Sequence, residues 1–253
     1  MVVRFCTADL AYLLKNHRQG SARARKAWLE KNAVADSIGK RRLFRQPGPS
    51  GLGTYKLPRR HGMNTIYLYA LNVSALNPDS AVWAAFVSPG RRERMAAIRR
   101  IDDRRRSLGV ELALNAALSR HMDGYTPPPA YRRLPGGKPV LETSGELFIS
   151  LAHAGDWAVC ALHSAAVGVD IERRERTAAV PVREWVGIES YLKLTGAGLS
   201  GGFRTLCAGE TEIYRLGTRV ACLARGEVGD CLVCAATDEP ACLQIEAVTP
   251  PIP

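Results

Sequence analysis

The segment VGVDIE at residues 167–172, followed by WVGIESYLK at residues 185–193, decides the expected fold of this chain. In the first segment apolar residues alternate with Asp170 and Glu172, so a β-strand places both carboxylates on one face, about 6.6 Å apart along the strand. In the second segment a glutamate and a lysine are four residues apart, so a helix brings them to one face. We therefore expect a strand and a helix that together present three carboxylates and one ammonium.

These four side chains indicate a chemistry. Two carboxylates can share one Mg²⁺ ion and leave positions for water and for substrate phosphates. Three acids and a lysine therefore suggest metal-assisted phosphoryl chemistry. Taken singly, each pair has a simpler interpretation: Asp170 and Glu172 as the solvent face of an edge strand, and Glu189 with Lys193 as an ordinary pair on a helix surface.

The positive charge of the chain is confined to its first quarter. The 253 residues contain 35 Lys or Arg and 24 Asp or Glu, which gives a net charge of +11. Residues 1–62 contain 14 of the basic and 3 of the acidic residues, so the whole excess lies there. We interpret residues 1–62 as a basic N-terminal extension, disordered or misassigned, with Met63 as the native start. A targeting segment and a nucleic-acid tail are the alternatives.

The composition also indicates the cellular compartment in which the protein lies. No apolar run approaches the length of a membrane span, and the N-terminus lacks a continuous apolar segment of the secretory type. The seven cysteines have no disulfide-framework spacing, which fits a reducing cytosol. The single CxxC at residues 231–234 has no second pair, which favours a strand over a zinc site. We expect a cytoplasmic protein without a membrane contact.

Periodicity predicts the remaining elements. They are a strand over residues 66–71, a helix that begins at Ser88-Pro89, a second helix with Leu108, Leu112 and Ala116 on one face, a three-strand meander over residues 147–151, 157–162 and 167–172, and a helix over residues 185–195. Eight arginines and three acids lie between residues 91 and 106, which is compatible with a solvated helix face and with a phosphate-binding surface.

A faint internal echo accompanies these elements. Six residues between Asp156 and Glu172 recur 74 positions later, between Asp230 and Glu246, without a gap. Both segments have strand-like patterns. The echo suggests that an α+β half has been duplicated.

Together these segments resemble the Sfp-type 4′-phosphopantetheinyl transferases. In chain order, that family has a Gly-Lys-Pro loop, a strand that ends in a Ser-His-like turn, a Gly-Val/Ile-Asp-Ile/Leu-Glu strand, and a Trp-x-x-Lys-Glu helix followed by Gly-x-Gly. The matching segments here are residues 137–139, 152–153, 168–172, 185–193 and 196–198. The resemblance covers roughly residues 64–248, and residues 1–62 take no part in it.

The resemblance implies an α+β fold of two pseudo-symmetric α+β halves, with antiparallel sheets and a ligand cleft between the halves. We place the N-terminal half at residues 63–164 and the C-terminal half, which carries the metal site, at residues 165–253. The implied reaction is the Mg²⁺-dependent transfer of the 4′-phosphopantetheine arm of coenzyme A to a serine of an apo acyl, peptidyl or aryl carrier protein. It releases 3′,5′-ADP and is the holo-acyl-carrier-protein synthase reaction. The implied protein is a cytoplasmic monomer that binds neither nucleic acid nor a membrane.

The resemblance also implies roles for the four motif side chains. Asp170, Glu172 and Glu189 would hold Mg²⁺ on the pyrophosphate of coenzyme A. Glu189 would also take the proton of the carrier serine, directly or through water. Lys193 would stabilise the charge that develops on the bridging phosphate oxygen. Asp170, Glu189 and Lys193 therefore form the expected catalytic set.

Further basic residues would bind coenzyme A. By the same resemblance, Lys138, His153 and Arg106 would contact its phosphates and its adenosine end. Arg91 and Arg94 match basic positions that help to bind the 3′-phosphate of the nucleotide. Cations at these positions would fix the leaving nucleotide.

Departures from the family pattern motivate an alternative. An alanine precedes His153, Ile188 stands where the family has a lysine, and residues 173–184 form a connection shorter than the usual one. The alternative is a catalytically impaired paralogue that binds coenzyme A or a carrier protein without transfer. A remote alternative from another class is a nucleic-acid-binding protein that uses residues 1–62 and the arginine-rich region. The lack of interleaved aromatic residues disfavours it.

Overall fold

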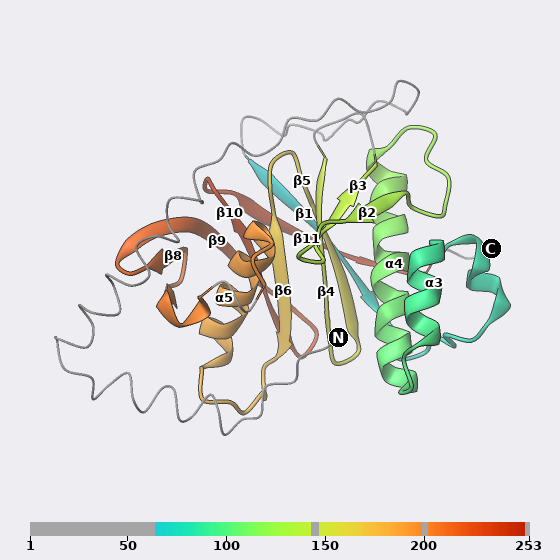
Figure 1. The fold of residues 1–253 in the computed structure, drawn as a ribbon, viewed down its shortest axis with the longest axis horizontal. Helices are drawn as coiled ribbons and strands as arrows, with labels where there is room; N and C mark the ends of the chain where they lie inside the picture. The colour runs from blue at the N-terminus through green and yellow to red at the C-terminus, as the bar shows by residue number, and fades with distance from the viewer. Residues whose placement is uncertain (1–63, 143–146, 199–201, 251–253) are drawn as a thin grey trace. The chain divides into compact units, whose positions relative to one another are not determined.

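The computed structural model of this chain describes residues 64–142, 147–198 and 202–250. These residues form helices and mostly antiparallel sheets, so the fold belongs to the α+β class, as expected (Figure 1). The interpretation of residues 1–62 and of Met63 lies outside the described residues. Among the helices that are described, none combines the length and the apolar content needed to cross a membrane.

Along the chain, two helices follow the first strand, and a third lies among the later strands. The helices are α3 (Pro89–Ala96), α4 (Ile101–His121) and α5 (Val182–Thr195), with short 3-10 turns η2 (Ala81–Ala85) and η3 (Phe203–Thr205). The strands are β1 (Thr65–Asn72), β2 (Tyr131–Arg133), β3 (Pro139–Leu141), β4 (Phe148–Ala154), β5 (Trp157–His163), β6 (Gly168–Arg173), β7 (Leu206–Ala208), β8 (Glu212–Arg215), β9 (Thr218–Val228), β10 (Cys231–Thr237) and β11 (Cys242–Val248).

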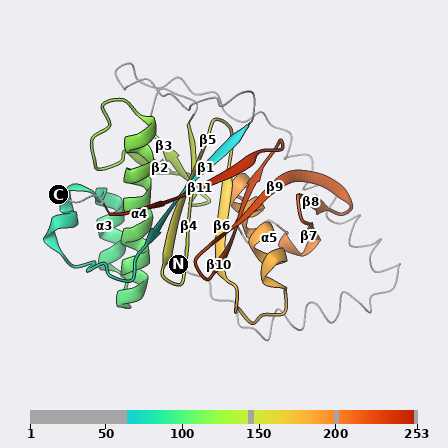
Figure 2. The same cartoon turned by 180° about the vertical axis from the view of Figure 1, so that it is seen from behind.

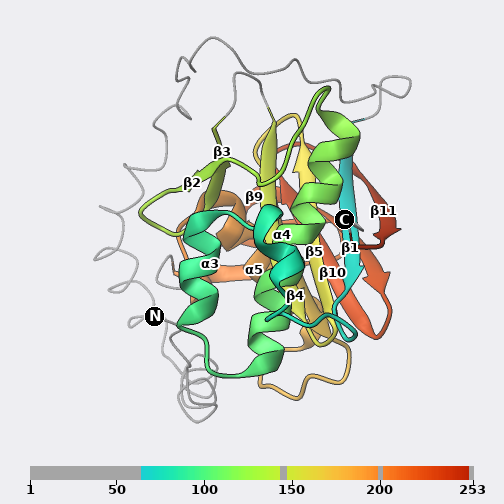
Figure 3. The same cartoon turned by 90° about the vertical axis from the view of Figure 1, so that its right-hand side faces the viewer.

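The first sheet has four strands in the order β11-β1-β5-β4. Strand β1 pairs antiparallel with β5 and parallel with β11. Both faces of β1 are buried, because its side chains alternate between two cores: Tyr67 and Tyr69 pack with α4, and Ile66 and Leu68 pack on the opposite face. Figure 3 shows α4 lying along this sheet.

The second sheet has five strands in the order β6-β10-β9-β8-β7 and is antiparallel. Helix α5 covers one of its faces, where Leu192 packs with Cys234 and Ala236 of β10. The other face of β10 presents Val233 to the core that contains Leu68 of β1. The elements therefore follow the order α4, first sheet, second sheet, α5, which is visible from both sides in Figures 1 and 2.

The two sheets meet where β4 lies beside β6 (Figure 1). Here the Ser150 hydroxyl of β4 accepts a hydrogen bond from the Val169 backbone N–H of β6 at 2.9 Å. The predicted three-strand meander is correct for β4 and β5 and wrong for β6, which pairs with β10 in the other sheet. The reason is that both edges of β5 are already taken, one by β1 and the other by β4.

The other predicted elements are confirmed. Helix α3 begins at Pro89 with Ser88 at its N-cap. In α4, Leu108, Leu112 and Ala116 are all buried. Helix α5 begins at Val182, three residues before the predicted start. The CxxC segment lies in β10 with both cysteines buried and free, as expected for a strand.

Candidate active site

Asp170 and Lys193 form the centre of the candidate site. Asp170 lies on β6 and is 8% exposed, and Lys193 lies near the end of α5. The Lys193 Nζ donates a hydrogen bond to Asp170 Oδ1 at 2.6 Å. Burial raises the pKa of the Asp170 carboxyl, and the charge of Lys193 opposes this rise. The alternation in VGVDIE is thus confirmed, since Asp170 faces α5 while Val169 and Ile171 face the core between the sheets.

The glycine of the VGVDIE segment sets the distance between β6 and α5. A methyl group added at Gly168 would lie 2.0 Å from the Ser190 carbonyl oxygen and 2.2 Å from the Leu194 backbone nitrogen. Only glycine therefore lets the helix backbone lie directly on the strand at this point. The short Asp170–Lys193 contact depends on this close approach.

Glu189 lies one turn before Lys193 on α5 and is partly exposed. Burial, and next the negative charge of Asp170, raise the pKa of Glu189 to about 7, while the positive charges of Lys193 and Arg176 lower it. A carboxyl group with this pKa exchanges protons readily at neutral pH. Glu189 is therefore suited to act as a general base.

Glu172, the second acid of the strand, is paired with a residue that the sequence analysis did not single out. The Arg176 Nε lies 3.2 Å from Glu172 Oε2, and the Glu172 Oε1 accepts a hydrogen bond from the Arg173 backbone N–H at 3.0 Å. The Arg176 guanidinium also lies over the Trp185 ring, 4.8 Å from its centroid. The only sequence signal for Arg176 is its position four residues after Glu172. It lies in the connection of residues 173–184, from which the sequence suggested only that the connection is short.

The three carboxylates are close enough to interact, because the negative charges of Asp170 and Glu172 both raise the pKa of Glu189. Even so, within residues 64–142, 147–198 and 202–250 no group of three or more His, Cys, Asp and Glu side chains is arranged to hold a metal ion. Lys193 contacts an oxygen of Asp170, and Arg176 contacts an oxygen of Glu172. Carboxylates are the donors that Mg²⁺ prefers, but in this arrangement they do not fit the ion.

His153 stands at the end of β4, close to two of these elements. The residue is exposed to solvent, although neighbouring protein atoms still desolvate part of the ring. This desolvation, together with the positive charges of Lys193, Arg106 and Arg91, lowers the pKa of His153 to about 4. The Arg106 Nη1 donates to the Gly155 carbonyl oxygen in the adjoining turn at 3.2 Å. His153 thus lies within electrostatic reach of cations from α3, α4 and α5.

Lys138, from the Gly-Lys-Pro loop, ties this loop to α5. Its Nζ donates hydrogen bonds to the Leu194 carbonyl oxygen at 2.6 Å and to the Val167 carbonyl oxygen at 3.3 Å. Burial lowers the pKa of Lys138 to about 8. The ammonium meets the carbonyl-rich end of α5, where a positive charge is favourable. The loop therefore stabilises the end of the helix that carries Glu189 and Lys193.

Arg91 and Arg94 have different environments although they are three residues apart on α3. Arg91 is buried, and its Nε lies 3.0 Å from Oε2 of Glu111, which is fully buried. The same Glu111 accepts hydrogen bonds from the Ser88 hydroxyl at 2.5 Å and from the Tyr131 hydroxyl at 2.8 Å. The charge of Arg91 is therefore used within the protein. Arg94 is exposed.

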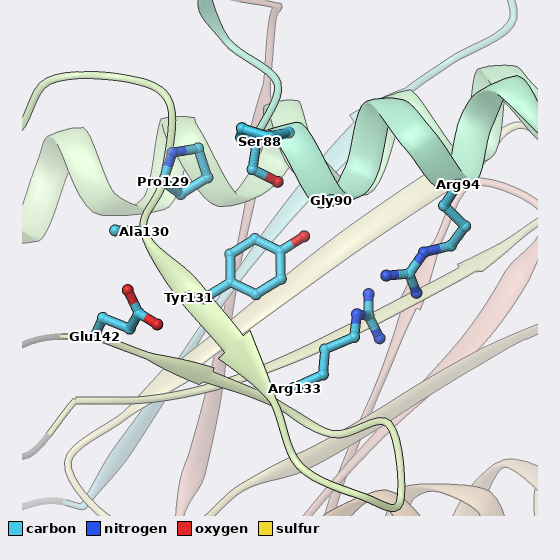
Figure 4. Close-up of a pocket in the computed structure, with 9 residues that line it drawn as sticks. Ser88, Gly90, Arg94, Pro129, Ala130, Tyr131, Arg133 and Glu142 are labelled. Carbon is cyan, nitrogen blue, oxygen red and sulfur yellow. The ribbon is translucent and has the colours of Figure 1, made fainter.

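Arg94 lines a cavity of about 350 Å³ at the start of α3 (Figure 4). The lining residues are Ser88, Pro89, Gly90, Arg94, Pro129, Ala130, Tyr131, Arg133 and Glu142. The side chains of Arg94 and Arg133 extend toward each other in Figure 4. Burial, followed by the charges of Arg91 and Arg94, lowers the pKa of Arg133. Two guanidinium groups near a helix N-terminus favour an anion, and Arg133 carried no motif signal.

The fold and the site define a class: an α+β protein with an acid and lysine cluster between a strand and a helix. No family model matches the chain. The chain is 31% identical over 101 residues to 4′-phosphopantetheinyl transferase psf-1 of Bacillus pumilus, a match that covers 30% of this chain and 43% of that protein. It is 26% identical over 89 residues to 4′-phosphopantetheinyl transferase Sfp of Bacillus subtilis (strain 168), which covers 35% of this chain and 40% of that protein.

The matched part of the chain spans less than half the length of each of these curated relatives. Within that extent, both carry the name that the motifs predict. The resemblance of this chain to the Sfp-type 4′-phosphopantetheinyl transferases is thus confirmed by two known proteins.

Proposed function

We propose that this protein is a 4′-phosphopantetheinyl transferase. It moves the phosphopantetheine arm of coenzyme A to a serine of an apo acyl, peptidyl or aryl carrier protein and releases 3′,5′-ADP, as a cytoplasmic monomer. The observation that carries the proposal is the convergence of Asp170, Glu189 and Lys193 between β6 and α5. The names of the two relatives support the same class of reaction.

The proposed fold has two pseudo-symmetric halves, residues 63–164 and 165–253, with a ligand cleft between them. The internal echo supports this proposal, because its residues fall on β5 and β6 in one copy and on β10 and β11 in the other. Each of β5 and β10 pairs antiparallel with the first strand of its half. Each half also places one long helix on its own sheet, α4 on the first and α5 on the second.

The proposed reaction is a displacement at phosphorus. The serine oxygen of the carrier protein forms a bond to the phosphorus that bears the pantetheine arm, and the bond from this phosphorus to the oxygen of the leaving 3′,5′-ADP breaks. Glu189 accepts the serine proton, for which a pKa of about 7 is well suited. Lys193 stabilises the negative charge on the leaving phosphate.

Coenzyme A would lie along the basic residues around this centre. We propose that Arg94 and Arg133 bind the 3′-phosphate in the cavity of Figure 4, and that His153 and Arg106 contact the remaining phosphates and the adenosine end. Arg91 would act indirectly, since it holds Glu111 and thereby Ser88 and Tyr131 of the cavity wall. Lys138 would act through its hydrogen bonds to the end of α5. We also propose that it contacts coenzyme A.

We also propose that Asp170, Glu172 and Glu189 hold Mg²⁺ when it is bound. The donors suit the ion, but the present arrangement does not, because Lys193 and Arg176 contact two of the three acids. The same internal ion pairs favour the second candidate, an impaired paralogue that binds coenzyme A or a carrier protein without transfer.

Intact mass spectrometry separates these candidates. The protein is incubated with coenzyme A, Mg²⁺ and a panel of apo carrier proteins of the three kinds, and each carrier is examined for the added mass of one phosphopantetheine arm. Transfer that is lost in Lys193→Ala supports the transferase. No adduct on any carrier, combined with calorimetric binding of coenzyme A, supports the impaired paralogue, and the absence of both contradicts the proposed function.

A further inference from the structure

The acid cluster formed by Asp170, Glu172 and Glu189 contains a cation that does not belong to its motifs. Arg176 lies between the end of β6 and the start of α5. Its Nε lies 3.2 Å from Glu172 Oε2, and the two side chains are only 22% and 29% exposed. This pair is therefore more enclosed than the surface pair of Arg174 and Glu227, whose side chains are 52% and 56% exposed.

Trp185 holds the guanidinium of Arg176 from a second side. The distance from the guanidinium carbon to the centroid of the indole is 4.8 Å, which is within the range of a cation–π contact. Trp185 is itself placed edge-on against Phe203, with ring centroids 6.3 Å apart. Arg176 is thus held between a carboxylate and an aromatic ring that is fixed by its neighbour.

The charge of Arg176 acts on the whole cluster and not on Glu172 alone. Besides its ion pair with Glu172, it lies near enough to Asp170 and Glu189 for its positive charge to favour their ionised forms. One of its nitrogens, Nη1, is buried without a hydrogen-bond partner among the described residues. The guanidinium therefore neutralises the acids while its own hydrogen-bonding capacity is incompletely used, which lowers the cost of moving it.

A divalent cation on Glu172 would face this guanidinium at close range, where like charges repel strongly. We propose that Arg176 is an internal competitor of the divalent cation: it occupies Glu172 in the metal-free protein and must leave Glu172 before a metal ion binds there. The inference rests on the proposed carboxylate metal site. It adds Arg176, a residue of the short connection, to that site. Arg176 then sets how tightly the site binds metal.

Mn²⁺ binding tests the inference without any need for transfer activity. Free Mn²⁺ is measured by electron paramagnetic resonance in a titration of the full chain and of its variants. Arg176→Gln should bind Mn²⁺ about three- to ten-fold more tightly than the unmodified chain, as expected for removal of a partly exposed ion pair. Arg176→Lys keeps the charge and should stay close to the unmodified chain, and Arg174→Gln, which removes an exposed arginine nearby, should leave the affinity unchanged.

Two further measurements connect the effect to the site. Glu172→Gln should abolish the gain produced by Arg176→Gln when the two are combined. Mn²⁺ should change the fluorescence of Trp185, identified by difference from Trp185→Phe, in the unmodified chain but not in Arg176→Gln. An unchanged or weaker affinity in a folded Arg176→Gln variant, or no Mn²⁺ binding in any variant, overturns the inference. Tighter binding without transfer to any carrier protein upholds the inference and counts against the proposed function alone.

Discussion

Glu189 gives the proposed reaction its pH dependence. Burial raises the pKa of this carboxyl from 4.5 to about 7. Below that pH, Glu189 is protonated in most molecules and cannot accept the serine proton. We predict that the transfer rate at saturating coenzyme A rises as the pH increases through about 7. The measurement is a pH–rate profile on one carrier protein.

Glu189→Gln is the matched variant for this profile. It should lose nearly all transfer, because the amide accepts no proton, while binding of coenzyme A persists. A profile that is flat across neutral pH, or substantial transfer by Glu189→Gln, would show that another group takes the proton.

The buried ion pair of Arg91 and Glu111 should contribute more to the free energy of unfolding than an exposed pair such as Arg174 with Glu227. Removing one partner leaves a charge without a counterion in the core, which costs about 3–5 kcal/mol. We predict a loss of this size for Arg91→Ala, measured from the urea midpoint and slope of unfolding. Arg174→Ala, whose pair with Glu227 is exposed, should change the free energy of unfolding by less than about 1 kcal/mol. Equal effects of the two substitutions would contradict the prediction.

These residues show how far sequence reasoning reaches at this scale. Asp170 and Lys193 were predictable because their spacing follows strand and helix periods, and the structure pairs them. Arg91 and Arg94 have the same charge and lie on the same helix. They differ because Glu111, on the neighbouring helix α4, pairs with Arg91 in the core, whereas Arg94 lines the cavity at the start of α3. Arg176 was not predictable, because its position depends on the path of a connecting segment and not on a period.

Among the elements, α5 and β6 depend on Gly168 for their separation. We predict that Gly168→Ala pushes the helix away from the strand, destabilises the protein by about 1–3 kcal/mol and lowers transfer further than the loss of folded protein explains. The reason is that Glu189 and Lys193 move with the helix while Asp170 stays on the strand. Urea unfolding and the transfer rate, both measured on the same preparation, check this expectation.

Gly90 provides the control, because nothing lies within 4 Å of a methyl group added there and it lies in the first turn of α3. Gly90→Ala should keep the stability or raise it by about 0.4–1 kcal/mol, as expected where alanine fits the backbone. If Gly168→Ala left the free energy of unfolding unchanged or raised it, as Gly90→Ala should, the close approach of α5 to β6 would not be what sets the site.

Element prediction worked where one face of an element decides its conformation, as in α4 and α5. It was wrong for the partner of β6. Alternation states which side chains share a face, and it does not state which strand lies at each edge. The partner of β6 was decided elsewhere in the chain, because β1 already occupies the edge of β5 that a meander would need. Long-range pairing of this kind leaves no local pattern.

At the scale of the molecule, the two proposed halves share one sheet and one core. Strand β11, the last one described, pairs with β1 and completes the edge of the first sheet. The core between the sheets contains Leu68 and Val159 from the first half and Val169 and Val233 from the second, all at most 1% exposed. Neither half can bury these surfaces without the other.

We therefore predict that residues 63–164 and residues 165–253, expressed separately, do not fold. The first fragment would expose the inner face of its sheet and leave β1 with an open edge, a template for aggregation. The second would expose β6 and β10 on the face that β1 and β5 cover. Circular dichroism and thermal unfolding of each fragment should give no cooperative transition, while mixing the two should restore one. A cooperative transition in either fragment alone would show that a half has a sufficient core of its own and that the shared core is not what couples the two sheets.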